Sequence, residues 1–257
     1  MEQRRQEHGK NHAGAGSIRT YKKDSDVSYA LGAAPAFELL KKLPGQARRV
    51  FIHSSWERGA ASDELFAICR SLGIEPEERD KAFSVLSQKE NCFVIGEFEK
   101  YRCALDPEKP HIVLVNPSNS GNLGTIMRTA LGFGVRDIAI ITPAVDMFDP
   151  KTVRASMGAI FSLRAACFPS FEDYLASGDC GAEERELYPF MLKARTALGA
   201  KPLKRRCSLI FGNEATGLPD SFLGVGESLI IRHSREIDSL NLPMAVGIAL
   251  YELSREG

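Results

Sequence analysis

Small, amide and carboxylate residues gather in three separated segments of the second half of the chain. These are residues 116–128 (NPSNSGNLGTIMR), 209–218 (LIFGNEATGL) and 230–242 (IIRHSREIDSLNL). Each is joined to a short apolar run typical of a buried strand. Ligands usually bind at the carboxyl ends of the strands of a parallel sheet. We therefore expect the three segments to form one composite pocket at a sheet edge.

The first segment has the pattern of a helix with two different faces. Its apolar stripe contains Leu123, Ile126, Met127 and Ala130. The opposite face carries Gly121, Gly124, Thr125 and Arg128. Because glycine leaves the backbone open and first-turn amides attract anions, a phosphate or carboxylate could bind there. An ordinary capped helix with an exposed arginine explains the same residues equally well.

The other two segments add loop residues suited to ligand binding. Gly212 would let a ligand approach the backbone, and Glu214 could orient a hydroxyl or an amine. The loop lacks the Lys-Ser/Thr pair of a phosphate-binding P-loop, which argues against a nucleoside triphosphatase. Asn241 is placed as an N-cap, with Pro243 in the first turn of the following helix. A purely structural cap is the alternative for that segment.

Composition indicates an ordinary globular protein. The 257 residues are 44% hydrophobic and 26% charged with a net charge of zero, which argues weakly against non-specific coating of nucleic acid. Residues 193–206 hold six basic and no acidic side chains, a run more often solvated than functional.

No apolar stretch approaches the roughly 20 residues that span a bilayer, so we expect no membrane contact. The N-terminus lacks the apolar core of a secretory signal, so we expect a cytoplasmic protein. Scattered cysteines and histidines predict neither a metal site nor a disulfide framework.

The elements divide the chain into two units after a tail. Residues 1–30 are expected to be a disordered tail, residues 31–103 a small α/β unit, and residues 108–257 a larger one. Prolines between the units indicate a linker at 105–110. In the small unit we expect helices near 37–40, 62–72 and 80–86 and strands at 49–52 and 92–96. In the larger unit we expect strands at 111–115, 137–142, 208–211 and 228–231 and helices at 121–133, from 149 and from 242. This alternation predicts a parallel sheet covered on both faces.

The last helix has two apolar stripes. Leu242, Ala245, Val246, Ala249 and Leu253 form one; Met244, Gly247, Ile248 and Tyr251 form the other. Both stripes cannot face one core, so we expect a subunit interface on this helix.

Together the three segments resemble the three motifs of the SpoU/TrmH family, the RNA ribose 2′-O-methyltransferases of the SPOUT superfamily. Residues 122–128, 211–218 and 237–245 match the motifs in order, and residues 154–159 are also family-like. The small N-terminal unit is similar to the ribosomal-protein-like RNA-binding domain that often precedes this catalytic domain.

The resemblance implies a C-terminal trefoil knot, a homodimer and S-adenosylmethionine as methyl donor to a ribose 2′-hydroxyl of tRNA or rRNA. It implies cofactor contacts at Gly212, Ile231 and Leu240. It places at the reacting end the side chains of Asn122, Arg128, Glu214, Ser239 and Asn241. A guanidinium stays protonated in water, so we expect Arg128 to hold phosphate and polarise the hydroxyl.

The chain departs from the family pattern in places. Asn213 replaces a frequent alanine, residues 242–244 replace Val-Ser-Val, and residues 232–235 are unusually basic. A non-catalytic RNA-binding protein that kept the fold is the alternative function. The five intact reacting-end residues argue against it.

Overall fold

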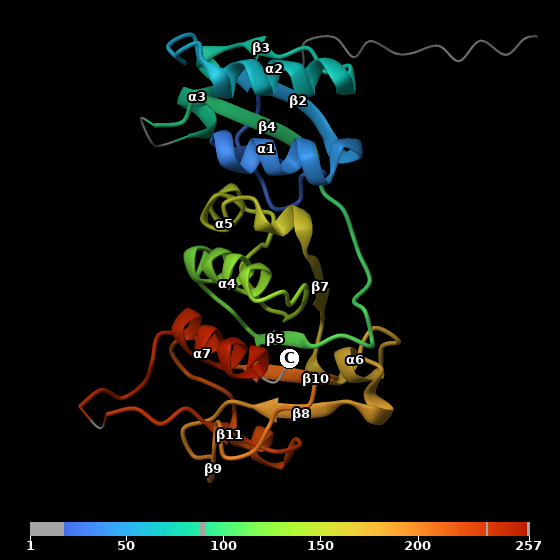
Figure 1. The fold of residues 1–257 in the computed structure, drawn as a ribbon, viewed down its shortest axis with the longest axis vertical. Coiled ribbons are helices and arrows are strands. Elements are labelled where there is room, and N and C mark those ends of the chain that lie inside the picture. Colours follow the sequence, from blue (N-terminus) through green and yellow to red (C-terminus); the bar gives the residue numbers. More distant parts are fainter. Residues whose placement is uncertain (1–17, 88–90, 235, 256–257) are drawn as a thin grey trace, which may run out of the picture.

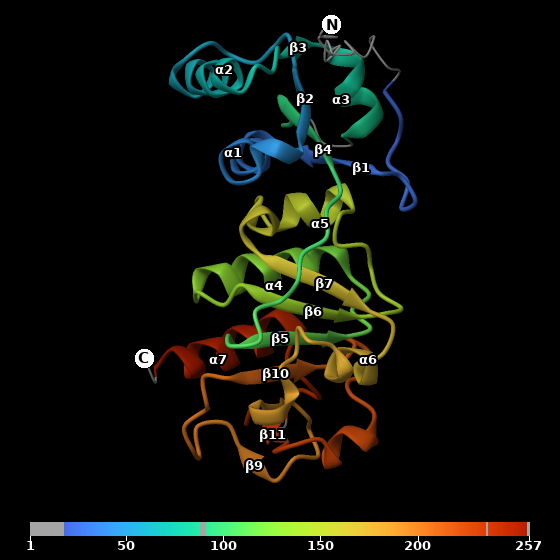
Figure 2. The same cartoon turned by 90° about the vertical axis from the view of Figure 1, so that its right-hand side faces the viewer.

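The computed structural model describes residues 18–87, 91–234 and 236–255. Two units, each built on its own sheet, are stacked along the long axis of the molecule, with helices α1 and α5 between the sheets (Figures 1 and 2). Among the described residues, none of the helices is both long enough and apolar enough to cross a lipid bilayer.

The N-terminal unit is a four-stranded sheet with helices on both faces. Its strands are β1 (Val27–Leu31), β2 (Ala47–Ile52), β3 (Glu77–Glu78) and β4 (Val94–Glu99), in the order β1-β4-β2-β3. Its helices are α1 (Ala33–Lys42), α2 (Ala60–Leu72) and α3 (Asp80–Leu86). Helices α1 and α2 bury one face of the sheet, around Leu40 and Leu65. Helix α3 covers the other through Phe83.

The predicted extent of the tail is wrong at its C-terminal end. Residues 27–31 form β1, which pairs antiparallel with β4 from Val27 opposite Glu99 to Leu31 opposite Ile95. Tyr29 and Ala30 are buried in this strand. The tail was extended too far because the polar residues before Val27 concealed a short strand whose partner lies about 65 residues further on. Residues 1–17 of the predicted tail lie outside the described residues.

The second unit contains the predicted parallel sheet. Its strands are β5 (His111–Val115), β6 (Asp137–Ile141), β7 (Arg164–Phe168), β8 (Glu186–Pro189) and β10 (Cys207–Phe211), in the order β7-β6-β5-β10-β8. All four strand pairs are parallel. Two-residue strands β9 (Thr196–Ala197) and β11 (Leu229–Ile230) pair separately. Strands β7 and β8 were not predicted, because they are less continuously apolar than β5 and β6.

Helices cover both faces of this sheet, as predicted. They are α4 (Ser120–Gly132), α5 (Pro150–Ala155), α6 (Phe171–Ala176) and α7 (Leu242–Ser254). Successive strand residues point to opposite faces, so Ile112 and Leu114 pack with α4, α5 and α7, whereas Val113 and Val115 pack with α6. The predicted apolar stripe of α4 is fully buried, as expected.

The two units share one apolar core. Ala30, Leu39 and Phe98 of the N-terminal unit belong to the same buried cluster as the helices of the second unit. The rings of Phe98 and Phe161 meet edge to face with centroids 5.0 Å apart. The Tyr101 hydroxyl donates to the carbonyl of Ile160 at 3.0 Å. The junction is therefore packed like an interior rather than joined only by the linker.

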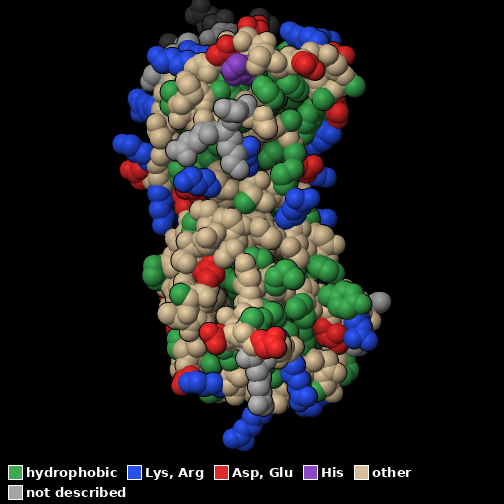
Figure 3. Space-filling model, turned by 90° about the vertical axis from the view of Figure 1, so that its left-hand side faces the viewer, with side chains coloured by type: hydrophobic (Ala, Val, Ile, Leu, Met, Phe, Trp, Pro, Cys, Tyr) green, Lys and Arg blue, Asp and Glu red, His purple; other side chains and the backbone are tan. Residues whose placement is uncertain are grey.

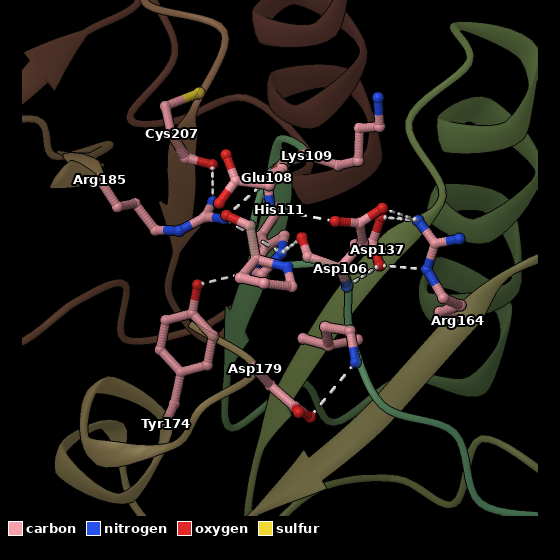
Figure 4. A network of polar contacts seen from close by, with 12 residues as sticks. Asp106, Glu108, Lys109, His111, Asp137, Arg164, Tyr174, Asp179, Arg185 and Cys207 are labelled. Atoms are coloured by element: carbon pink, nitrogen blue, oxygen red, sulfur yellow. Dashed lines mark hydrogen bonds and ion pairs between the residues drawn. The ribbon is translucent and has the colours of Figure 1, made fainter. Parts of the chain in front are cut away.

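A buried polar network closes the amino-terminal edge of the parallel sheet (Figure 4). The Arg185 guanidinium, 6% exposed, donates to the carbonyls of Cys207, Pro107 and Lys109. The Nε2 atom of His111 lies 2.8 Å from the carbonyl of Asp106, and its Nδ1 atom lies 2.8 Å from the Tyr174 hydroxyl. A carbonyl only accepts, so Nε2 carries the proton and Nδ1 accepts from the tyrosine.

Burial and the nearby positive charge of Arg185 lower the pKa of His111 from 6.5 to about 4. Between these values the unfolded chain binds a proton that the folded chain does not, so stability rises with pH across this window and is complete above 6.5. The free energy of unfolding of the wild type should fall by about 2 kcal/mol from pH 7 to pH 5 through this group. Urea denaturation of His111→Gln should show a flatter pH dependence, with His53→Gln as the matched control. Equal slopes in wild type and His111→Gln would contradict this assignment.

Candidate functional site

A pocket of about 330 Å³ lies at the carboxyl end of β10, a strand found in the lower part of Figures 1 and 2. This volume is in the range of small-molecule sites. Two of the three predicted segments line it, through residues 211–218 and through residues 230, 231, 233, 239, 240 and 242, whereas residues 116–128 do not. The pocket contains all three residues assigned to the cofactor by resemblance, namely Gly212, Ile231 and Leu240. It also contains Glu214 and Ser239.

One wall of the pocket was not foreseen from the sequence. Residues 190–193, which follow β8, line it. The rings of Phe190 and Phe211 are stacked in parallel with centroids 4.5 Å apart. Phe190 is held by its backbone amide, which donates to the carbonyl of Ile210 at 2.8 Å. Only the pairing of β8 with β10 brings this residue to the site, so no local pattern could have indicated it.

His233 is a second lining residue that was not among the predicted site residues. It is half-buried and lines the pocket. Its Nδ1 atom lies 3.0 Å from the carbonyl of Ile231, so this nitrogen carries the proton of the neutral ring. The Nε2 atom is then an acceptor.

Gly212 is required by the loop itself. A Cβ atom at this position would lie 2.1 Å from the backbone carbon of Gly217 and 2.3 Å from the nitrogen of Leu218. Real side chains do not tolerate such distances, so a larger residue would force the 212–218 loop open. We expected glycine at position 212 because a ligand could then approach the backbone closely. The structure adds a second reason, which is that the chain itself passes close to this position.

The Glu214 carboxylate joins the second segment to the first. It accepts hydrogen bonds from the backbone amides of Ser118 (3.0 Å) and Asn119 (3.2 Å) and from the Ser118 hydroxyl (2.9 Å). It also accepts from the side-chain amide of Asn122 at 3.2 Å. The anion expected at the start of this helix is therefore supplied by the protein itself. Burial opposes ionisation of Glu214, but the hydrogen bonds from its own backbone, Ser118 and Asn122 outweigh it and lower its pKa.

The face of α4 opposite its apolar stripe is only partly open. Gly124 is buried, and a Cβ atom there would lie 2.5 Å from the Cβ of Ala155 in α5. The expectation that both glycines leave backbone open to a ligand is therefore wrong for Gly124, which allows two helices to touch. Arg128 is exposed and lies outside the pocket. It has no hydrogen-bond or ion-pair partner in the part of the chain that the structure describes.

The third segment reaches the site in part. Ser239 lines the pocket, whereas Asn241 occupies the N-cap position of α7 without lining it. The Asn241 side chain makes no capping hydrogen bond, so the predicted cap is right in position and wrong in its side-chain contact. The structure thus gathers five of the predicted residues at the pocket, links Asn122 to them through Glu214, and leaves Arg128 and Asn241 outside.

The basic run at 193–206 is largely neutralised. Lys193 pairs with Asp220, Lys201 with Glu227, and Lys204 with Glu186. Arg206 contacts both Glu184 and Glu108. These pairs favour the solvated-surface interpretation. Within residues 18–87, 91–234 and 236–255, no three His, Cys, Asp or Glu residues come together as a metal site would require.

Replacing Glu214 by glutamine should loosen the start of α4, because one acceptor oxygen becomes an NH₂ group facing backbone amides. We expect the variant to lose roughly 1 kcal/mol of unfolding free energy at neutral pH, since the site is partly solvated. The folded pKa lies below the ordinary value of 4.5, so the stabilisation is present above that pH and is lost as the pH falls through the folded pKa. Urea denaturation should therefore show the two proteins converging in acid. The control is Glu75→Gln at an exposed position. Equal losses of unfolding free energy in both variants would contradict a stabilising role for the hydrogen bonds of Glu214.

The larger unit of the chain matches a known protein family. Residues 109–251, more than half of the chain, match the family model described as the SpoU rRNA Methylase family. An uncharacterized tRNA/rRNA methyltransferase of Synechocystis is 32% identical over 146 residues, which cover 56% of this chain and 53% of that protein. The 23S rRNA (uridine(2479)-2′-O)-methyltransferase of Streptomyces viridochromogenes is 28% identical over 160 residues, covering 56% of this chain and 52% of that protein. The chain thus spans about half the length of these curated relatives.

Solved structures match over a longer stretch. The AdoMet-bound rRNA methyltransferase of Sinorhizobium meliloti has 25% sequence identity and a TM-score of 0.75. The match covers 90% of this chain and 88% of that one, and so includes both units. The mixed α/β fold with its parallel sheet is therefore shared with known methyltransferases.

Proposed function

The chain belongs to the SpoU rRNA Methylase family, and from that premise we propose that it transfers a methyl group from S-adenosylmethionine to a ribose 2′-hydroxyl of tRNA or rRNA. The observation that carries the proposal is the joining of the three motif segments at one sheet edge. Two of them line the pocket, and Glu214 hydrogen-bonds the third to it. The name of the Streptomyces relative, a 2′-O-methyltransferase, supports the same reaction.

The pocket suits the proposed cofactor. Its stacked phenylalanines and the side chains of Met191, Leu242 and Ala245 offer an apolar surface for an adenine ring. Backbone groups of the loops around Gly212, Ile231 and Leu240 would hold the polar edges of the molecule. Bound there, S-adenosylmethionine supplies an electrophilic methyl group.

The remaining motif residues have roles that follow from their positions. Arg128 is exposed and unpaired among the described residues, so its planar guanidinium group is available to hydrogen-bond a phosphate and the ribose hydroxyl. Asn122 is oriented by Glu214. Ser239 at the pocket and Asn241 at the start of α7 would complete the reacting end. A protonated guanidinium stabilises developing negative charge on the hydroxyl oxygen rather than removing its proton.

The N-terminal unit is proposed to bind the RNA. We extend this unit from the predicted 31–103 back to β1 and residues 18–26, because Ile18 and Tyr21 pack against its core, and we keep the catalytic unit at 108–257. The shared core supports a fixed placement of the RNA-binding unit above the catalytic one. The knot implied by the resemblance would lie in residues 209–254, where two loops and α7 surround one pocket. A cytoplasmic location stays a prediction.

A homodimer built on α7 is also part of the proposal. Met244 (61% exposed) and Tyr251 (58%) stand out from α7 with Ile248 between them. Figure 3 shows hydrophobic side chains exposed on the lower half of the molecule, on the face where α7 lies. The other stripe of α7 is buried against α4, with Val246, Ala249 and Leu253 in the core. One helix therefore presents one covered and one uncovered apolar stripe.

The decisive experiment is single-turnover methylation with tritiated S-adenosylmethionine and total RNA from cells lacking the gene. Arg128→Ala should lower the rate by roughly two to three decades, as removal of one preorganised donor does. Arg128→Lys should restore little, because lysine lacks the planar fork. Cofactor affinity by calorimetry should be unchanged in both.

Arg136→Ala, which removes an exposed arginine at the opposite sheet edge, is the matched control. A near wild-type methylation rate for Arg128→Ala would show that this arginine is only a surface charge and takes no part in the transfer. A folded wild type that binds RNA but neither binds the cofactor nor transfers methyl groups would favour the non-catalytic alternative.

Tyr251→Asp should convert the dimer to monomer, because it introduces a charge into an interface while leaving the buried stripe of α7 intact. Light scattering at matched concentrations measures the change. Leu72→Asp, the same kind of substitution on an exposed position of α2, should remain dimeric. A dimeric Tyr251→Asp would show that another surface pairs.

A further inference from the structure

The side chain of Asn213 connects two loops that come from different strands. Its Nδ2 atom donates to the carbonyl of Asn116 at 2.7 Å, and its Oδ1 atom accepts from the amide of Ala215 at 2.9 Å. The backbone of Asn213 also accepts from the amide of Gly217 at 2.9 Å. Asn213 is therefore fixed within the pocket loop while it reaches the segment that follows β5.

The residue that it holds has an unusual backbone conformation. Asn116 has φ 54°, and Met157 is the other non-glycine residue with positive φ among those described. This left-handed region is unfavourable for most side chains, and asparagine tolerates it best. Asn116 is held on three sides. Its amide donates to Ile141 at 3.0 Å, its side chain to the carbonyl of Pro143 at 3.2 Å, and its own carbonyl accepts from Asn213.

The left-handed turn determines where α4 begins. Asn116 directly follows β5, which ends at Val115, and α4 starts four residues later, at Ser120. Glu214, the neighbour of Asn213, holds the far end of this connection through the amides of Ser118 and Asn119. Two consecutive residues of the pocket loop, Asn213 and Glu214, thus hydrogen-bond to the two ends of the short connection between β5 and α4. Both contacts join segments that are distant in the sequence.

Given the proposed function, we infer that Asn213 is a positioning residue for the methyl transfer. By holding the carbonyl of Asn116 it keeps this residue left-handed, and it thereby sets Asn122 and Arg128 at a defined place relative to the pocket. Asn213 also lines the pocket, but both polar atoms of its side chain are bound to protein, Nδ2 to Asn116 and Oδ1 to Ala215, so it acts through the 116–119 connection. In a chain with alanine at this position, Glu214 alone would hold the 116–119 connection to the pocket loop.

Three variants test the inference. Asn213→Ala should lower kcat on total RNA by roughly tenfold, in line with one buried hydrogen bond, with an unchanged cofactor Kd by calorimetry. Asn116→Gly and Asn116→Val both lose the bond to Pro143, but only glycine adopts positive φ freely. Asn116→Gly should therefore keep most of the activity, and Asn116→Val should fall at least as far as Asn213→Ala.

Hydrogen exchange supplies a readout that needs no activity. Amides of residues 118–122 should exchange faster in Asn213→Ala and Asn116→Val than in the wild type or Asn116→Gly. If Asn213→Ala weakens cofactor binding while these amides stay protected, the residue serves its own loop and the inference is overturned. Wild-type exchange and kcat in Asn213→Ala would overturn it as well. A wild type without methyl transfer would defeat the proposed function, and the exchange pattern would still decide the positioning.

Discussion

The carboxylate of Glu214 at the start of α4 is the contact on which the arrangement of the site depends. Backbone amides at a helix start attract an anion, and here the anion is a side chain from another strand's loop. Without it, the α4 segment and the pocket loops would be related only by the sheet beneath them. With it, Asn122 is oriented directly and Arg128 stands two turns beyond the held end.

The same connection is also supported from the N-terminal unit. Asp146, in the loop after β6, accepts from the Tyr21 hydroxyl and lies 3.5 Å from the Lys100 ammonium. The neighbouring amide of Val145 donates to the carbonyl of Pro117 at 2.8 Å. An unbroken series of contacts therefore joins the unit proposed to bind RNA to the segment proposed to meet the ribose. Phe98 and Phe161, both buried, pack against each other on the core side of this junction.

The two edges of the parallel sheet use polar residues for different purposes. At the amino edge, Arg185 and His111 are buried and their donors are matched to carbonyls and a hydroxyl, so this network stabilises the fold. At the carboxyl edge, Glu214 is partly open and Arg128 is exposed. Lys193, Lys201 and Lys204 of the basic run are paired with carboxylates, which reduces the local positive charge.

The sequence alone determined the parallel α/β sheet, the helix at 120–132 and the segments that surround the pocket, because apolar periodicity and turn residues act over a few neighbours. It did not reveal β1, Phe190 at the pocket, or Gly124 between α4 and α5, since each depends on a partner distant in the chain. The resemblance named Glu214 without its task, and Asn213 stood only as a departure from a motif. Their hydrogen bonds to residues 116–122 join atoms more than 90 positions apart. Only the folding of β5 beside β10 brings those residues within reach, so the tertiary structure decided which polar side chains line the pocket and which hold the protein together.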